Sequence, residues 1–274
     1  GLPYWIIRNS LWDYFHPLEK DLSTDVVIVG SGITGALMAH ELCHAGIKCC
    51  IVDKRSIATG SSAASTALLQ YEIDVPLCRM AKIIGEENAA TAYHACLQSI
   101  SDIKRVLEET GVNAGFEQLP SLFYASSAAD NKLLEQEHEI RQKHKLPVNL
   151  LEKKKIREEY KVKTPGNALI NEASAQMDAY RAATGLLAYH IKESGLKVFT
   201  HTSIKECIET SDGCIMTTDR GHKIKCGYVI IATGFEAGQF LPQKIMDLTS
   251  TYALVSHPVA SEHLWPTHCL IWET

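Results

Sequence analysis

Residues 25–53, DVVIVGSGITGALMAHELCHAGIKCCIVD, are the stretch that decides the fold. The apolar, β-branched run at 25–29 is typical of a buried parallel strand. Glycines follow at 30, 32 and 35, and apolar residues at helical spacing then continue to Gly46, which suits the position just past a helix end. A second buried strand, 49–52, ends at Asp53. This order predicts a dinucleotide-binding βαβ unit.

Each polar or small residue of this unit has a physical role toward a dinucleotide. Gly30 allows the tight turn from strand to helix, Gly32 lets the backbone approach a pyrophosphate, and Gly35 lets the helix pack closely on the strand. The N–H groups and dipole at the helix N-terminus favour a phosphate group. Asp53 lies close to the separation of about 20 residues at which an acid bonds the ribose hydroxyls.

The segment that follows, 59–69 (TGSSAASTALL), consists of small and hydroxyl residues. Such residues would let the backbone and the hydroxyl groups approach an extended cofactor. A flexible serine-rich loop is the alternative interpretation. A simple nicotinamide-binding half would continue with a third strand, whereas here a long helical region, 76–109, follows.

A second signature lies late in the chain. The patterns predict, in order, a helix at 177–194, a strand at 197–201 with its exit at 202–204, hairpin strands at 215–218 and 223–225 around the turn 219–221, and a buried strand at 228–231. The last strand runs into Ala232-Thr233-Gly234. Open α/β sheets bind ligands at such small-residue turns, at the carboxyl ends of strands. We therefore expect both signatures to meet at one crevice.

On these residues the chain resembles the FAD-dependent amine oxidoreductases of the D-amino-acid oxidase, glycine oxidase and sarcosine oxidase superfamily. The resemblance rests on GSGITG (30–35) with Asp53, GSSAASTALL (60–69), QMDAYRAATGLLAYHIKESGLKVFTHTSI (176–204) and YVIIATG (228–234). It covers most of the chain and is specific to the superfamily rather than to one member. It implies an α/β fold, in which a Rossmann-like FAD-binding domain with a parallel sheet and a β-meander is interleaved with an incomplete α+β substrate domain.

The resemblance also implies a set of cofactor-binding residues. The 30–35 turn would hold the pyrophosphate, Asp53 the adenosine ribose, and the 61–68 segment would follow the ribityl chain and flavin. The Ile204 backbone would face adenine. In full, the implied set is Gly30, Ser31, Gly32, Ile33, Thr34, Gly35, Asp53, Lys54, Arg55, Ser61, Ser62, Ser65, Thr66, Ala67, Leu68, Ile204, Ala232, Thr233 and Gly234.

The chemistry implied is oxidation of the carbon–nitrogen bond of a small amine or amino acid. A hydride would pass to flavin N5, water would hydrolyse the resulting imine, and oxygen or another acceptor would reoxidise the flavin. No residue is singled out as a catalytic acid, base or nucleophile. Where sarcosine-oxidase-like members carry basic residues near flavin and substrate, this chain has Ala67, Leu68 and Gln70. Gln70 either faces the substrate or makes a structural hydrogen bond.

Two other functions stay open at this point. Family members continue beyond the position at which this chain ends, so we expect a piece that lacks the family's carboxylate-binding Arg and Tyr and part of its flavin cradle. A truncated or degenerate nucleotide-binding domain without turnover is therefore the first alternative. An NAD-linked dehydrogenase is the second, disfavoured by the missing third strand and by the turn at 232–234.

Composition limits the partners and the compartment. The 274 residues are 46% hydrophobic with a net charge of −5, which gives no basic field for nucleic acid. The nine cysteines form no C-x-x-C or zinc-type spacing, so we expect no metal site and buried free thiols in a reducing, cytoplasmic compartment. The sequence contains neither a signal peptide nor an apolar run of about 20 residues that would span a membrane.

The domain organisation that we expect is discontinuous. Residues 1–24 form an aromatic arm that packs as a strap, with a lid or dimer contact as alternatives. Residues 25–75 and 166–241 form the FAD-binding domain, and residues 76–165 and 242–274 form the substrate domain, with strands at 248–258 and 268–272.

Overall fold

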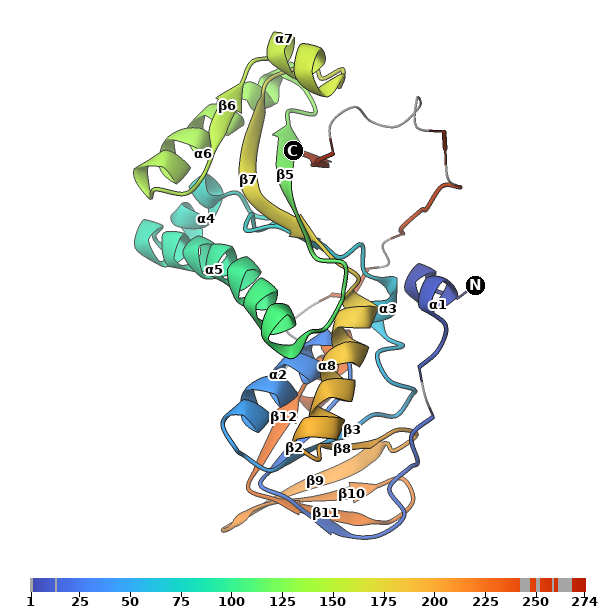
Figure 1. Cartoon of the computed structure of the whole chain (residues 1–274). Helices are drawn as coiled ribbons and strands as arrows, with labels where there is room; N and C mark the ends of the chain where they lie inside the picture. Colours follow the sequence, from blue (N-terminus) through green and yellow to red (C-terminus); the bar gives the residue numbers. More distant parts are fainter. Residues whose placement is uncertain (1, 13, 242–246, 250–251, 258, 261–267) are drawn as a thin grey trace. The chain divides into compact units, whose positions relative to one another are not determined.

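The computed structural model describes residues 2–12, 14–241, 247–249, 252–257, 259–260 and 268–274. The chain forms two compact units (Figure 1). Unit 1 comprises residues 1–67, 107–114 and 178–255, and unit 2 comprises residues 68–106, 115–177 and 256–274. These boundaries place the N-terminal arm in unit 1 and residues 68–75 and 166–177 in unit 2.

Unit 1 is built on a four-stranded parallel sheet. The strand order is β12 (Tyr228–Ile231), β2 (Val26–Val29), β3 (Cys49–Val52) and β8 (Lys197–Phe199). Every residue of β2 is buried, as expected of a parallel strand that is covered on both faces. The predicted strands 49–52 and 228–231 are confirmed at both ends.

Helices cover one face of this sheet and a β-meander covers the other (Figure 1). On the helical side, α2 (Ile33–His44) packs against α8 (Ala179–Glu193). The meander consists of β9 (Ile204–Thr210), β10 (Gly213–Thr218) and β11 (Lys223–Cys226), which pair antiparallel. The cluster that joins sheet and meander contains Leu18, Val27, Val29, Cys50, Val52, Met216, Ile224 and Cys226.

Helix α2 ends in a Schellman turn, which fixes the path of the chain into β3. Gly46 has a φ of +72°, the left-handed conformation that favours glycine. Its N–H donates to the Cys43 carbonyl at 3.0 Å, and the Ile47 N–H donates to the Leu42 carbonyl at 2.9 Å. The predicted role of Gly46 just past the helix end is confirmed.

The N-terminal arm packs on unit 1 at separate points. It contains α1 (Tyr4–Asn9) and β1 (Leu22–Ser23), and β1 pairs in parallel with β11. The Trp5 indole Nε1 donates to the Ser65 carbonyl at 2.7 Å, and the Asn9 amide donates to Asp178 Oδ2 at 2.7 Å. The Leu18 N–H donates to Thr202 Oγ1 at 3.0 Å. The arm thus makes hydrogen bonds to unit 1 at three separate points.

Unit 2 consists of a mixed sheet with helices. The sheet order is β13 (Leu270–Glu273), β5 (Glu117–Tyr124), β7 (Ala168–Gln176) and β4 (Leu68–Leu69), and β6 (Asn149–Leu151) also pairs with β7. The other elements are α4 (Leu77–Ile84), α5 (Glu86–Thr110, whose last residues belong to unit 1), η1 (Ala128–Asp130), α6 (Asn131–Lys143), α7 (Lys153–Lys155) and the π-helix η2 (Ile156–Tyr160).

The core of unit 2 encloses a charged group. Arg141 on α6 is 1% exposed and lies between Glu137 and Glu72, with its Nε 2.6 Å from Glu137 Oε1 and its Nη1 3.3 Å from Glu72 Oε1. The rings of Tyr71 and Tyr93 lie beside the guanidinium, each with its centroid 5.5 Å away. Glu137 also accepts the N–H groups of residues 77 and 78 at the start of α4.

Several predictions need correction. The helical region 76–109 is two helices, because Gly85, with a φ of +86°, separates α4 from α5. Strands β7 and β9 were not predicted. No strand forms at 248, 249 or 252–257, and the remainder of the predicted strand 248–258 lies outside the described residues. All nine cysteines are described and free, yet only Cys50, Cys78 and Cys226 are buried, so burial of the thiols was predicted too broadly.

Candidate functional site

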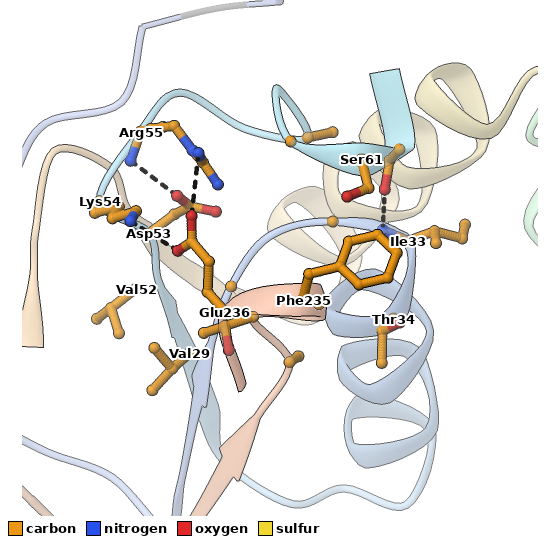
Figure 2. A pocket seen from close by; sticks show the side chains of 18 of the residues that line it. Val29, Ile33, Thr34, Val52, Asp53, Lys54, Arg55, Ser61, Phe235 and Glu236 are labelled. Atoms are coloured by element: carbon orange, nitrogen blue, oxygen red, sulfur yellow. Dashed lines mark hydrogen bonds and ion pairs between the residues drawn. The ribbon is translucent and has the colours of Figure 1, made fainter. Parts of the chain in front are cut away.

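A cavity of about 630 Å³ lies at the carboxyl ends of the parallel strands of unit 1 (Figure 2). Its lining comes from the turns after β2, β3 and β12, the N-terminus of α2, the short helix α3 (Ser61–Ala64), the exit of β8 at 202–204, and η3 (Gly234–Phe240). Its volume lies within the range of small-molecule and cofactor sites. The crevice expected from the two sequence signatures is this cavity.

Gly30, which lines the cavity, and Gly35, which packs against Gly30, are both required by close backbone contacts. A Cβ atom on Gly35 would lie 2.0 Å from the Gly30 carbonyl oxygen, and one on Gly30 would lie 2.4 Å from the Ala232 carbonyl oxygen. Gly30 also has a φ of +110°, which is accessible to glycine at little cost. These two glycines therefore bring β2, α2 and the turn after β12 together, and they set the shape of the floor.

The N-terminus of α2 faces the cavity and is surrounded by small residues. Gly32 precedes the helix in an extended conformation, and the Ile33 N–H donates to Ser62 Oγ at 2.9 Å. A Cβ on Gly32 would lie 3.1 Å from the same hydroxyl oxygen. Because the N-terminal N–H groups and dipole of a helix attract negative charge, this end of the cavity suits a phosphate group.

Asp53 is held at the end of β3 by a network of hydrogen bonds. Its Oδ2 accepts the Ser31 N–H at 2.8 Å and the Ser31 hydroxyl at 2.6 Å, and its Oδ1 accepts the Arg55 N–H at 2.8 Å. A carboxylate oxygen has two acceptor positions, so Oδ1 can also accept from a ligand hydroxyl. Ser31, which is fully buried, thus orients the acid rather than lining the cavity.

An ion pair closes one side of the cavity. Glu236 on η3 lies 2.7 Å from Lys54 Nζ and 3.4 Å from Arg55 Nη1, and Figure 2 shows the three side chains converging beside Asp53. The hydrogen bond from Lys54, with the charge of Arg55, lowers the pKa of Glu236. Glu236 therefore neutralises cations that would otherwise face a ligand.

Thr233, in the turn after β12, carries a buried polar side-chain atom. Its Oγ1 has no hydrogen-bond partner among the described residues, although the residue lines the cavity. A buried hydroxyl without a partner is costly, and a ligand in the cavity would relieve that cost. This hydroxyl, the helix N-terminus and the Asp53 carboxylate together fit the diphosphate and hydroxyl groups of a dinucleotide.

Most of the predicted site residues line this cavity. They are Gly30, Gly32, Ile33, Thr34, Asp53, Lys54, Arg55, Ser61, Ser62, Ser65, Ile204, Ala232, Thr233 and Gly234. Ser31, Gly35, Thr66, Ala67 and Leu68 do not line it. Gly35 acts by packing, and Leu68 belongs to unit 2. Sequence reasoning missed Glu236 and its neighbours Phe235, Gln239 and Phe240, because no local pattern marks a turn residue that reaches back to the end of β3.

Gln70 lies in unit 2 and makes a hydrogen bond there. Its Nε2 donates to Ser121 Oγ at 3.4 Å, and the Trp272 indole donates to the same oxygen at 2.9 Å. Among the described residues, no group of three or more His, Cys, Asp or Glu side chains is placed to hold a metal ion. No helix within the described ranges has the length and apolar character needed to cross a bilayer.

Comparison with known proteins places this geometry in context. Residues 25–273 match the sequence model of the family described as "FAD dependent oxidoreductase". The chain is 23% identical over 232 residues to the putative Rieske 2Fe-2S iron-sulfur protein YhfW of Bacillus subtilis. The matched region covers 85% of this chain and 44% of that protein.

Solved structures share the fold. Glycine oxidase from Geobacillus kaustophilus superposes with a TM-score of 0.67 at 22% identity, over 79% of this chain and 57% of that chain. L-amino acid deaminase from Proteus vulgaris superposes with a TM-score of 0.65 at 18% identity, over 83% and 52%. The chain thus spans about half the length of these relatives.

Proposed function

The chain belongs to the family of FAD-dependent oxidoreductases, and from that premise we propose that its unit 1 cavity holds FAD and that the protein oxidises the carbon–nitrogen bond of a small amine or amino acid. The observation that carries the cofactor site is the meeting, in one cavity, of the glycine turn, the α2 N-terminus and the Asp53 carboxylate. The similarity to a glycine oxidase and an L-amino acid deaminase supports an amine substrate.

Each part of the cavity has a role in this proposal. The backbone at Gly32 and the N-terminus of α2 bind the diphosphate, since both attract negative charge and neither presents a large side chain. Asp53, oriented by Ser31, accepts the ribose hydroxyls. The buried hydroxyl of Thr233 forms a hydrogen bond with the cofactor.

When bound, FAD supplies the electron-accepting ring that takes a hydride from the carbon bearing the amine nitrogen. The chain's contribution is to bind and orient this group in a cavity whose floor is fixed by backbone contacts.

The test begins with the purified chain mixed with excess FAD, passed through gel filtration, and examined for flavin absorbance in the protein peak. Gly32→Asp places a carboxylate beside the α2 N-terminus, and we expect at least a tenfold loss of FAD affinity. Gly195→Asp is the matched control, because Gly195 is exposed and an added Cβ meets nothing within 4 Å. We expect its affinity to stay within about twofold of wild type.

The second step is an anaerobic titration of the FAD-loaded chain with a panel of small amino acids and amines. Bleaching of the flavin bands by one of them supports the amine oxidoreductase and identifies its substrate class. FAD binding without bleaching by any member of the panel supports a nucleotide-binding domain without turnover. Binding of NAD⁺ in place of FAD would overturn the cofactor assignment.

A further inference from the structure

A pair of thiols lies at the end of α2 that is remote from the cavity. Cys43, in the last turn of α2, and Cys49, the first residue of β3, have their sulfur atoms 3.9 Å apart. Both side chains are half-buried, so small solutes reach them. We propose that Cys43 and Cys49 form a peroxide-reactive modification site, in which Cys43 is oxidised first and Cys49 then closes a disulfide.

The backbone between the two residues holds the thiols in contact. The Schellman turn, with Gly46 at a φ of +72°, reverses the chain directly after Cys43. At the other end of the loop, the Val26 N–H donates to the Lys48 carbonyl at 3.1 Å and ties the entry of β3 to β2. A disulfide therefore needs the two sulfurs to close from 3.9 Å to about 2.05 Å.

The surroundings distinguish the two sulfurs. Either sulfur can donate in the contact between Cys43 and Cys49. That contact, together with a hydrogen bond between Cys43 and Ser194, lowers the pKa of Cys43 to about 7. The same contact and burial raise the pKa of Cys49. Since the thiolate is the reactive form, Cys43 is the attacking sulfur and Cys49 the resolving one.

Cys50, the residue after Cys49, differs from the pair in burial and in expected reactivity. It is 1% exposed, and burial raises its pKa to about 12. It therefore remains a thiol under conditions that oxidise the pair, although it is adjacent to Cys49 in the sequence.

The reaction balances with hydrogen peroxide as the oxidant. The Cys43 thiolate attacks one peroxide oxygen, so that an S–O bond forms and the O–O bond breaks. Cys43 is oxidised to the sulfenic acid, and the departing oxygen leaves as water after taking a proton. The Cys49 sulfur then attacks the sulfenic sulfur, forming the S–S bond, while the S–O bond breaks and a second water leaves with the thiol proton.

The experiment uses the reduced chain, exposed to hydrogen peroxide and then treated with iodoacetamide and trypsin. Cleavage after Lys48 separates the two thiols, because Cys43 lies in peptide 21–48 and Cys49 in peptide 49–54. We expect these peptides to be joined and lighter by two hydrogen atoms. The joined species should be lost in Cys43→Ser and Cys49→Ser, and retained in Cys50→Ser and in Cys96→Ser, which removes a half-buried thiol from unit 2.

Dimedone, which reacts with sulfenic acids, tests the order of the two steps. In Cys49→Ser we expect peroxide to leave a dimedone adduct on Cys43, and in Cys43→Ser we expect no adduct on Cys49. Recovery of alkylated peptide 21–48 from peroxide-treated wild-type protein would overturn the proposal. So would a joined peptide that persists in Cys49→Ser. Circular dichroism of each variant shows whether it has kept its fold.

Discussion

At the scale of single residues, Glu236 decides the electrostatics of the cavity. Lys54 and Arg55 follow Asp53 directly, and either cation would attract a diphosphate. Glu236 pairs with both, so their charge toward the cavity is reduced. Because the side chains are one third to one half exposed, water and salt screen these pairs, and each contributes little to stability.

Replacing Glu236 by Gln should therefore strengthen binding of ADP, which carries the diphosphate and adenosine of the proposed cofactor. We expect an affinity gain of about two- to fivefold at low ionic strength, because the two cations lose their partner. The gain should vanish in high salt. Titration calorimetry at two salt concentrations measures it, and a weaker affinity at low salt would mean that Glu236 itself contacts the ligand.

Lowering the pH of the wild-type chain should have part of the effect of Glu236→Gln, because protonation also removes the negative charge of Glu236. The pKa of Glu236 lies below its ordinary value of 4.5, because Lys54 and Arg55 stabilise the carboxylate. The stabilisation from these pairs is thus present above 4.5 and is lost as the pH falls through the lowered pKa.

The pKa of Glu72 is shifted in the opposite direction to that of Glu236, so its contribution to stability depends on pH in the opposite way. Its side chain is 2% exposed and its Oε2 has no partner among the described residues, and burial raises its pKa. The unfolded chain releases this proton near 4.5, whereas the folded chain holds it to higher pH. The contribution of Glu72 to stability is therefore present below 4.5 and is lost as the pH rises through the raised folded-state pKa.

Glu72→Gln cannot ionise and should remove this part of the pH dependence. We expect the free energy of unfolding to fall less in the variant than in wild type as the pH rises above 4.5. Urea unfolding at several pH values measures the difference, with Glu139→Gln, an exposed residue of α6, as the control. Parallel curves for wild type and Glu72→Gln would contradict the assigned cause.

At the scale of elements, the packing of α2 on β2 requires that residue 35 be a glycine, which has no side chain. The Cβ position of Gly35 lies 2.0 Å from the Gly30 carbonyl oxygen and 3.5 Å from the Ile28 side chain. Any side chain at position 35 must push α2 away from the strand. Because the same helix presents its N-terminus to the cavity, its displacement changes stability and ligand binding together.

Gly35→Ala should therefore lower the free energy of unfolding by about 2–4 kcal/mol, which is in the range of severe core disruption, and should abolish ADP binding. Gly195→Ala is the matched control, because it adds a methyl group at a φ of +67° with nothing within 4 Å. Its cost should be about 1 kcal/mol from backbone conformation alone. Chemical unfolding of both variants and of wild type provides the comparison.

The elements also show which features the sequence could predict. Strands 49–52 and 228–231 were placed correctly because continuous apolar runs next to glycine turns have few other interpretations. Strand β9 was missed because six of its seven residues are exposed, so that no buried pattern marks it. Glu236 was missed because its role arises from pairing with residues 54 and 55, far away in the sequence.

At the scale of the whole molecule, the chain passes between the two units repeatedly, and each unit has its own core. The cavity residues all belong to unit 1. A ligand there stabilises the local structure that it contacts, and hydrogen exchange reports such stabilisation segment by segment.

We expect ADP to slow amide exchange in residues 26–53 and 228–240 and to leave residues 117–124 and 168–176 unchanged. Exchange followed by mass spectrometry, with and without ADP, measures this. Comparable protection in the strands of unit 2 would show that binding couples the units, and would contradict a response confined to unit 1.

The bond between the Trp5 indole and the Ser65 carbonyl has an optical consequence. Ser65 lines the cavity, so this indole is a fluorophore attached to the cavity wall. Trp12 also lies in unit 1, and Trp272 lies in unit 2. A chromophore that enters the cavity would quench the emission of the first indole by energy transfer. The fluorescence of Trp5 should therefore report in real time, and without an added label, whether the cavity is occupied.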